Sequence, residues 1–231
     1  GLETCAEEIG TRLAARGHDV HCYCRKNEQD DHLEEFKGVK RIVLMSVTHV
    51  AMETYSHTML ACLHVLRLKP DIVLAFNPAV STICSIPKVA GYPVVLNPDG
   101  YDWRRKKWGP IAKRFIYFSA WMSSKICDKL IIDAKSVTDY YAQDFDCDPV
   151  HIPNGANIDA ESRRPEILEE YGLKKDGYFL FLSRHVPENS CETVIEAFEG
   201  LDTDKRLVMG GGVPEDSPYA ASLRATRDPR I

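Results

Sequence analysis

The stretch DIVLAFNPAVSTICSIPKVAGYPVVLN (71–97) places an apolar segment on either side of a helical one. Asp71–Phe76 and Pro93–Asn97 read as strands, and Ser81–Ala90 between them reads as a helix that ends at Gly91. Apolar strands that alternate with helices are typical of parallel sheets covered on both faces. The stretch therefore predicts an α/β fold built on a parallel sheet.

The same alternation continues on both sides of this unit. Further strands are expected at 20–24, 39–45, 129–133, 150–153, 178–183 and 206–209, and further helices at 2–16, 55–68, 110–127, 136–145, 166–171, 191–200 and 218–226. The rhythm restarts after the polar stretch 154–164, which predicts two doubly wound, Rossmann-like domains, 1–158 and 159–231. A helix directly after Gly1 and a strand-like entry at 228–231 predict that the chain is incomplete at both ends.

Composition excludes several classes of protein. The 231 residues are 44% hydrophobic and 27% charged, as in an ordinary globular protein. No apolar run approaches the roughly 18 residues of a spanning helix. With 29 basic against 34 acidic residues the net charge is −5, which argues against a nucleic-acid binder. The eight cysteines form no Cys-x-x-Cys pair, so a reduced, cytoplasmic setting fits best.

Loops that follow strands are the candidate sites, because ligands of open parallel sheets bind at the carboxyl ends of the strands. In SRHVPENS (183–190), Arg184 follows a strand and lies close to the start of a helix. A guanidinium beside a helix N-terminus favours phosphate, and a surface arginine with Asn189 or Ser190 as the helix cap is the alternative. In MGGGVPED (209–216) the glycines allow a ligand to approach the backbone, and a flexible turn is the alternative.

Two more loops come from the first domain. NPDGYDWRRKKWGP (97–110) carries carboxylates, four successive basic residues and two tryptophans, a mixture suited to a polar, ring-bearing ligand. We expect Trp103 and Trp108 to serve that ligand. In the stretch 49–58, which follows a strand and leads into the helix at 55–68, His57 is either a hydrogen-bond donor to a ligand or a structural histidine.

Metal sites are not expected, and neither is a cofactor. DFDCD (144–148) lacks the glycine and glutamate that a calcium loop requires, so a solvated turn is expected there. Cys22 and Cys24 point to one face of a strand, but no second pair at zinc spacing accompanies them.

Taken together, the motifs resemble the retaining glycosyltransferases of family 4, whose two-domain architecture is called GT-B. GLET (1–4) is similar to the end of that family's glycine-rich first loop, IPNGA (152–156) to its interdomain signature, and SRHVPEN (183–189) to the opening of its donor domain. METYSHT (52–58) and NPDGYDWRRKKW (97–108) resemble segments of a bacterial branch that includes polysaccharide rhamnosyltransferases.

The resemblance implies an acceptor-side first domain, a partial donor-binding second domain, and a role for each matched residue. Arg184 would contact the donor diphosphate, with Asn189 where the broader family usually has lysine. Asp99 would polarise the acceptor, in a loop where the broader family often has histidine. The other implied residues are Gly210, Gly211 and Gly212 at the nucleotide, and Gly1, Glu3, His57, Asn97 and Arg104 on the acceptor side.

The implied reaction is a metal-independent hexosyl transfer, with retention, from a nucleotide-diphosphate sugar to a glycan or a lipid-linked acceptor in bacterial surface polysaccharide synthesis. The branch implies a thymidine-diphosphate rhamnose donor, while galactose, glucose and mannose donors stay open. The family's acidic donor-binding segment would lie beyond Ile231, so the chain as printed is expected to bind the donor poorly and to be inactive.

A basic, aromatic stretch raises the question of a membrane surface. Residues 103–125 hold seven lysines and arginines and no acidic residue. Ile111, Phe115, Phe118, Met122 and Ile126 recur at helical spacing, which predicts a stripe that faces the core. The cluster Arg104, Arg105, Lys106 and Lys107 is instead expected to meet anionic lipid, which would place the protein at the inner face of the cell membrane.

Three other functions are open. A GT-B epimerase or phosphorylase would share the fold and would turn over the donor without an acceptor. A non-catalytic sugar-nucleotide binding subunit is compatible with Asn189 in place of lysine. A nicotinamide dehydrogenase is disfavoured, because Glu215 stands at the last glycine position of the dinucleotide fingerprint.

Overall fold

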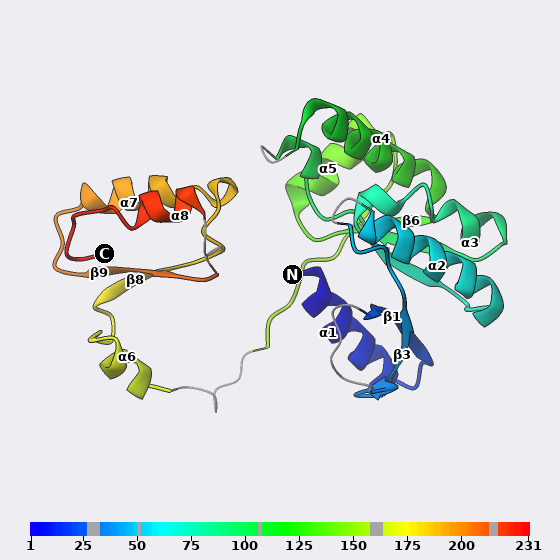
Figure 1. Cartoon of the computed structure of the whole chain (residues 1–231), viewed down its shortest axis with the longest axis horizontal. Helices are drawn as coiled ribbons and strands as arrows, with labels where there is room; N and C mark the ends of the chain where they lie inside the picture. Colours follow the sequence, from blue (N-terminus) through cyan, green and yellow to red (C-terminus); the bar gives the residue numbers. More distant parts are fainter. Residues whose placement is uncertain (27–32, 50–51, 106–107, 158–163, 213–216) are drawn as a thin grey trace. The chain divides into compact units, whose positions relative to one another are not determined.

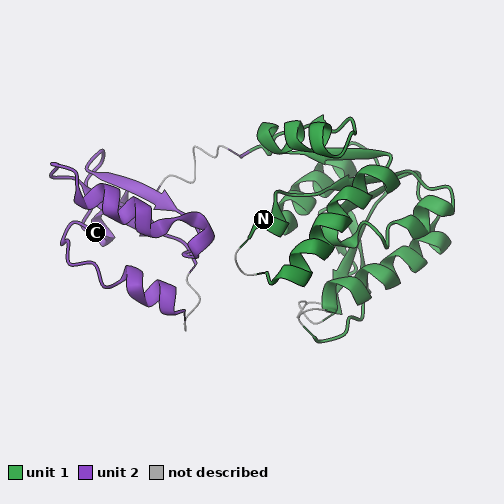
Figure 2. Cartoon of the chain, turned by 90° about the horizontal axis from the view of Figure 1, so that it is seen from above, with its two compact units in different colours: residues 1–155 green, residues 156–231 purple. Residues whose placement is uncertain are grey.

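The computed structural model describes residues 1–26, 33–49, 52–105, 108–157, 164–212 and 217–231. The chain divides into two compact units, Gly1–Gly155 and Ala156–Ile231 (Figure 2). The domain boundary predicted after residue 158 falls outside the described residues. Each unit is described by itself below.

The first sheet of unit 1 pairs β1 (Val20–Arg25) in parallel with β3 (Val39–Leu44). A two-residue strand, β2 (Glu35–Phe36), lies antiparallel on the other side of β3. The sequence did not predict it, because two residues are too few to show an alternating hydrophobic pattern. Helix α1 (Leu2–Ala15) packs closely on this sheet at Gly10. A Cβ atom there would lie 3.4 Å from Val39 Cγ2, so the missing side chain permits the close packing.

The second sheet of unit 1 is entirely parallel, as predicted. Its order is β4 (Val73–Phe76), β5 (Val94–Asn97), β6 (Lys129–Ile132), β7 (Val150–His151). The helices that follow its strands or precede them are α2 (Glu53–Leu68), α3 (Ser85–Val89), α4 (Pro110–Ile126) and α5 (Lys135–Asp144).

Helix α3 begins later than the sequence predicts. Pro78–Val80 forms a turn of 3-10 helix, and the α-helix itself starts only at Ser85. Pro87 lacks an N–H group, so it is tolerated in a first helical turn and not deeper in a helix. The predicted helix 81–90 is therefore cut to one short turn around this proline.

The core of unit 1 contains a cluster of aromatic rings centred on Trp103. Trp103 is only 8% exposed, and Tyr141 of α5 and Phe145 directly after that helix are fully buried beside it. The centroid of the Trp103 ring lies 5.6 Å from that of Tyr117 and 5.9 Å from that of Tyr140. The prediction that Trp103 grips a ligand is therefore wrong, because its ring belongs to the core.

Helix α4 buries a different face from the one predicted. Its buried residues are Ile116, Ser119, Ala120 and Ser123. Ser81 Oγ donates a 2.6 Å hydrogen bond to the Ser119 carbonyl, so small side chains bring α4 close to the segment before α3. Three residues of the predicted core stripe are exposed instead: Ile111 is 86% exposed, Phe115 42% and Phe118 48%. Its other two residues, Met122 and Ile126, are half-buried.

Unit 2 contains α6 (Glu166–Glu170), β8 (Tyr178–Leu182), α7 (Cys191–Glu199), β9 (Arg206–Gly210) and α8 (Pro218–Leu223). Strands β8 and β9 pair in parallel, with Tyr178 opposite Arg206. Figure 1 shows α7 and α8 on the same side of these strands. Its core holds Ile195, Phe198 and Leu207. Among the described residues of the whole chain, no helix is long and apolar enough to cross a membrane.

Replacement of the central tryptophan tests the core of unit 1. We expect Trp103→Ala to lower the free energy of unfolding by about 3–5 kcal/mol, because it leaves a cavity among packed rings. Trp121→Ala is the matched control, because Trp121 is 39% exposed, and should cost under about 1 kcal/mol. Denaturant unfolding measures both. Equal losses would show that Trp103 is not a core residue.

The carboxylate of Asp128 links α3 to two strands and makes stability depend on pH. Asp128 pairs with Lys88 and accepts a 2.8 Å hydrogen bond from the Val94 N–H. The Lys88 ammonium and the Val94 N–H hold the pKa of Asp128 below its usual value.

We therefore expect Asp128→Asn to be less stable than the parent at neutral pH, by under about 1 kcal/mol for so exposed a pair. A carboxyl group whose pKa is lowered by folding stabilises the protein at pH values above its pKa in the unfolded chain, which is about 3.9 for aspartate. The difference should stay constant from neutral pH down to that value and vanish as the pH falls through the lowered pKa. A difference that grows in acid would contradict this assignment.

Candidate functional site

Parallel pairing of β8 and β9 brings two predicted loops together in unit 2. The Ser183 N–H donates to the Gly210 carbonyl at 3.0 Å, and the His185 N–H donates to the Gly212 carbonyl at 3.0 Å. The arginine loop after β8 and the glycine loop after β9 therefore lie side by side at the carboxyl ends of their strands. This is the edge at which an open parallel sheet binds its ligands.

Gly211 is required by the neighbouring loop itself. Its φ of +129° is a conformation that side chains rarely allow, and a Cβ atom would lie 1.8 Å from the Ser183 carbonyl oxygen. For Gly212, in contrast, no described atom lies within 4 Å of the Cβ position. Of the three glycines, Gly211 is explained by packing, and Gly212 is the one with open space beside its backbone.

Arg184 lies in the loop after β8, and its side chain is exposed. Asn189 Nδ2 donates to the Arg184 carbonyl at 2.7 Å, which fixes the backbone of the loop. Among the described residues, none bonds to the Arg184 guanidinium. The next helix, α7, has Ser190 as N-cap without a side-chain hydrogen bond. Asn189 is thus neither the cap of this helix nor a free donor: its amide positions the loop that carries Arg184.

In unit 1 the loop after β5 is shaped by an amide side chain. Asn97 is 7% exposed, and its Oδ1 accepts a 2.9 Å hydrogen bond from the Asp99 N–H. Asp99 takes a left-handed conformation, with φ of 61°, and its carboxyl group is exposed. Burial raises the pKa of the nearby Tyr141, with smaller contributions from Cys147, Tyr140 and then the Asp99 charge. Asn97 therefore holds the turn, and Asp99 presents a carboxylate at the edge of the sheet.

The rest of that loop is engaged within the protein. The Asp102 carboxylate accepts hydrogen bonds from Arg105 at 2.8 Å and from Trp108 Nε1 at 3.2 Å, so the expectation that Trp108 serves a ligand is wrong as well. Arg104 is exposed, with its guanidinium carbon 4.5 Å from the centroid of the Tyr101 ring. Lys106 and Lys107 lie outside the described residues.

The other predicted acceptor-side residues lie on two helices. Gly1 is the N-cap of α1, and Glu3 is exposed in its first turn. His57 lies near the start of α2, where it is half-buried and its Nε2 is buried. These three residues thus lie on α1 and α2, whereas Asn97 and Asp99 lie at the end of β5 and Arg104 lies in the short 3-10 helix that follows.

Sequence reasoning missed a contact that joins α1 to the loop after β7. Cys5 donates to Asn154 Oδ1 at 3.4 Å, and Asn154 Nδ2 donates to the Asp133 carboxylate at 2.7 Å. Burial and the Asp133 charge raise the pKa of the Cys5 thiol, which favours the neutral donor. Asn154 belongs to the IPNGA segment, so its place after a strand was the signal that could have found it.

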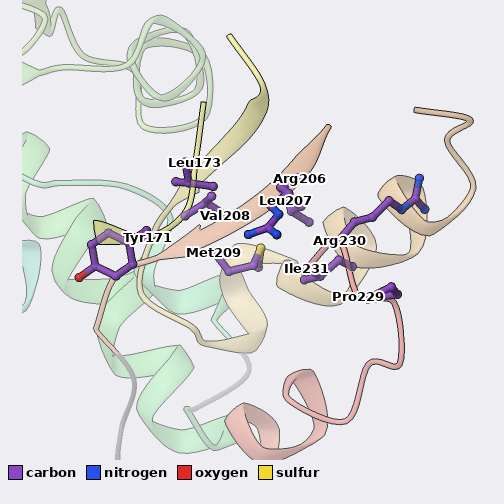
Figure 3. A pocket seen from close by; sticks show the side chains of 9 residues that line it. All are labelled: Tyr171, Leu173, Arg206, Leu207, Val208, Met209, Pro229, Arg230 and Ile231. Atoms are coloured by element: carbon purple, nitrogen blue, oxygen red, sulfur yellow. The ribbon is translucent and has the colours of Figure 1, made fainter. Parts of the chain in front are cut away.

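Metal ligands and pockets in the described part of the chain also bear on the position of a site. Over the described ranges, no three His, Cys, Asp or Glu side chains gather as a metal site. A pocket of about 310 Å³ lies along β9 and the final residues (Figure 3). None of the residues that line this pocket is a predicted site residue. The pocket lies beside β9, where the Leu207 N–H donates to the Arg230 carbonyl at 2.9 Å, and not at the loop that carries Arg184.

The fold is shared with solved GT-B-like proteins. HepE from Anabaena, crystallised in complex with UDP, superimposes with a TM-score of 0.67 at 13% identity. A putative UDP-N-acetylglucosamine 2-epimerase from Listeria monocytogenes gives 0.60 at 15% identity. The matches cover 97% and 95% of this chain but 61% and 62% of those chains, so this chain spans about three-fifths of their length. The class is thus Rossmann-like α/β of the GT-B type.

The family follows from residues 1–160, which match the model of Glycosyltransferase Family 4. The chain belongs to this family. No curated protein matches it.

Two neighbouring glycines provide a test of the loop geometry. We expect Gly211→Ala to destabilise unit 2 by about 1–3 kcal/mol from the backbone conformation alone, and by more because of the contact with the Ser183 carbonyl. Gly212→Ala should change stability by under about 1 kcal/mol. Thermal unfolding followed by circular dichroism compares the two. Equal stability of both variants would mean that the loops do not approach as described.

Proposed function

We propose that the protein is a glycosyltransferase that moves a sugar from a nucleotide-diphosphate donor to a hydroxyl group of an acceptor. Family membership supports sugar transfer. One observation supports a nucleotide-diphosphate donor: the exposed Arg184 and Gly212 lie on adjacent loops at the carboxyl ends of β8 and β9.

On the donor side, the diphosphate would lie against the loop after β8. As the bond between the anomeric carbon and the diphosphate oxygen breaks, negative charge grows on the leaving nucleoside diphosphate. The Arg184 guanidinium would stabilise that charge, and Asn189 would keep the loop in place through the Arg184 carbonyl. The uncapped start of α7 adds N–H groups near the same loop. Gly210, Gly211 and Gly212 would line the nucleotide pocket.

On the acceptor side, the hydroxyl oxygen attacks the anomeric carbon and gives up its proton. Asp99 would polarise that hydroxyl; the exposure of Asp99 on the turn that Asn97 holds at the end of β5 supports this role. Gly1, Glu3, His57 and Arg104 would contact the acceptor. We propose transfer with retention and without a metal ion or other cofactor.

The particular donor, acceptor and location belong to the same proposal. The complex of HepE with UDP supports a nucleotide donor, and the resemblance to one bacterial branch favours thymidine-diphosphate rhamnose. The acceptor would be a glycan or a lipid-linked sugar of surface polysaccharide synthesis, taken at the inner face of the cell membrane. In the basic cluster 104–107 that would meet the membrane, Arg105 is already paired with Asp102 and Arg104 stacks on Tyr101.

A thermal-shift panel tests the donor site. A nucleoside diphosphate that binds the native protein, supplied at ~100 times its Kd, should raise the free energy of unfolding by about 2.7 kcal/mol. The panel holds UDP, dTDP and GDP with their sugars, applied to the full-length protein. We expect the nucleotides of one base to raise the unfolding temperature. Arg184→Ala should weaken their binding at least tenfold and so reduce this shift.

The matched control is Arg224→Ala, which removes an exposed arginine at the C-terminal end of α8. It should leave the shift unchanged. A full shift in Arg184→Ala would contradict the donor site. Release of free sugar or sugar phosphate without an acceptor would favour an epimerase or phosphorylase, and nucleotide binding without turnover would favour a binding subunit.

A further inference from the structure

One face of α4 is turned to solvent although it carries large apolar side chains. Ile111, Arg114, Phe118 and Trp121 follow one another at spacings of three and four residues, which places them on one side of a helix. Ile111 is 86% exposed, Phe118 48% and Trp121 39%. These four residues are called the outer face of α4.

The outer face lies opposite the side that packs against the protein. The buried residues of α4 are Ile116, Ser119, Ala120 and Ser123, and Ser119 is held through its carbonyl by Ser81. The small side chains thus face inward, while the rings of Phe118 and Trp121 lie together outside, 5.9 Å apart between centroids. This is the reverse of the arrangement that a soluble surface helix normally has.

The apolar surface continues toward the start of α2. The Phe115 ring, 42% exposed, meets the Tyr55 ring edge-on at 5.8 Å. Figure 1 shows α4 as a long helix at the margin of unit 1, so this surface is not covered by the rest of that unit.

Charge is distributed unevenly around this face. The whole chain has a net charge of −5, yet residues 103–125 contain seven basic and no acidic residues. Arg114 is exposed at the centre of the outer face and bonds to none of the described residues. Lys125 is already engaged, because its Nζ donates to the Phe145 carbonyl at 2.9 Å. Arg114 therefore provides the positive charge among the apolar side chains of this face.

We propose that the outer face of α4 docks the protein on an anionic lipid bilayer. Ile111 and Phe118 would enter the boundary between headgroups and acyl chains, and the amphipathic ring of Trp121 suits the same depth. Arg114 would bind the lipid phosphates. A basic patch with apolar and aromatic side chains fits a bilayer, which presents negative charge over an apolar interior, better than it fits a second copy of an acidic chain. This proposal rests on the membrane location that belongs to the proposed function and assigns it to one helix face, while the donor site at Arg184 can fail or hold independently of it.

Vesicle flotation of the full-length protein tests the docking surface. The probes are vesicles of phosphatidylcholine alone and of phosphatidylcholine with phosphatidylglycerol. We expect binding to the anionic vesicles that weakens at high salt. Arg114→Glu should weaken it at least fivefold, since each basic residue near an anionic surface contributes about that factor. Ile111→Ser combined with Phe118→Ser should abolish it.

Val89→Ser is the matched control. Val89 is an apolar residue of α3 that is 88% exposed, nearly as much as Ile111, and it lies outside the basic stretch. It should bind vesicles as the parent does. Trp121 gives a second readout, because its emission should shift to the blue on binding and the shift should be lost in Trp121→Phe.

Equal binding of the parent and the Ile111→Ser, Phe118→Ser variant would overturn the proposal. So would equal binding to neutral and anionic vesicles, or an absence of binding to both. If the parent self-associates and the same double substitution makes it monomeric without any effect of lipid, a second copy covers the outer face and the lipid assignment is wrong.

Discussion

Parallel strand pairing forces the chain to return through a crossover after each strand, and it gathers the loops that follow the strands at one edge of each sheet. In unit 1 this brings Asn97, Asp133 and Asn154 to the ends of neighbouring strands β5, β6 and β7. In unit 2 it brings the arginine loop and the glycine loop into hydrogen-bonding contact. The candidate chemistry of the protein is therefore a consequence of strand direction.

Within unit 2 the candidate donor site is held by backbone groups and not by side-chain pairs. The Ser183 carbonyl lies so close to Gly211 that only glycine fits, and Asn189 binds the Arg184 carbonyl. Both contacts position the main chain and leave the Arg184 guanidinium exposed. Asn189 stands where the wider family usually has lysine, and its amide supports the loop; in the proposed site the charge would come from Arg184.

Strand positions and the parallel sheets were predictable, since apolar runs such as 93–97 are separated by clear helical segments. The loops that carry Arg184 and Asp99 were also predictable, because sheet topology alone places them at the carboxyl edge. The burial of Trp103 and the orientation of α4 were not. Hydrophobic periodicity gives no weight to Ser119, Ala120 and Ser123, whose small side chains allow the closest packing. The position of Asn154 after a strand marks it as a candidate, but its partners Cys5 and Asp133 lie far away in the sequence, so no local pattern reveals the bridge itself.

The central claim is that a nucleoside diphosphate binds the loops after β8 and β9. Hydrogen–deuterium exchange of the full-length protein, with and without the nucleotide that stabilises it, tests this most directly. The account predicts slower exchange in peptides that cover 183–190 and 210–212, with no change at residues 206–208 or 229–231 beside the pocket of β9. Protection confined to that pocket, or protection absent from both loops, would contradict it.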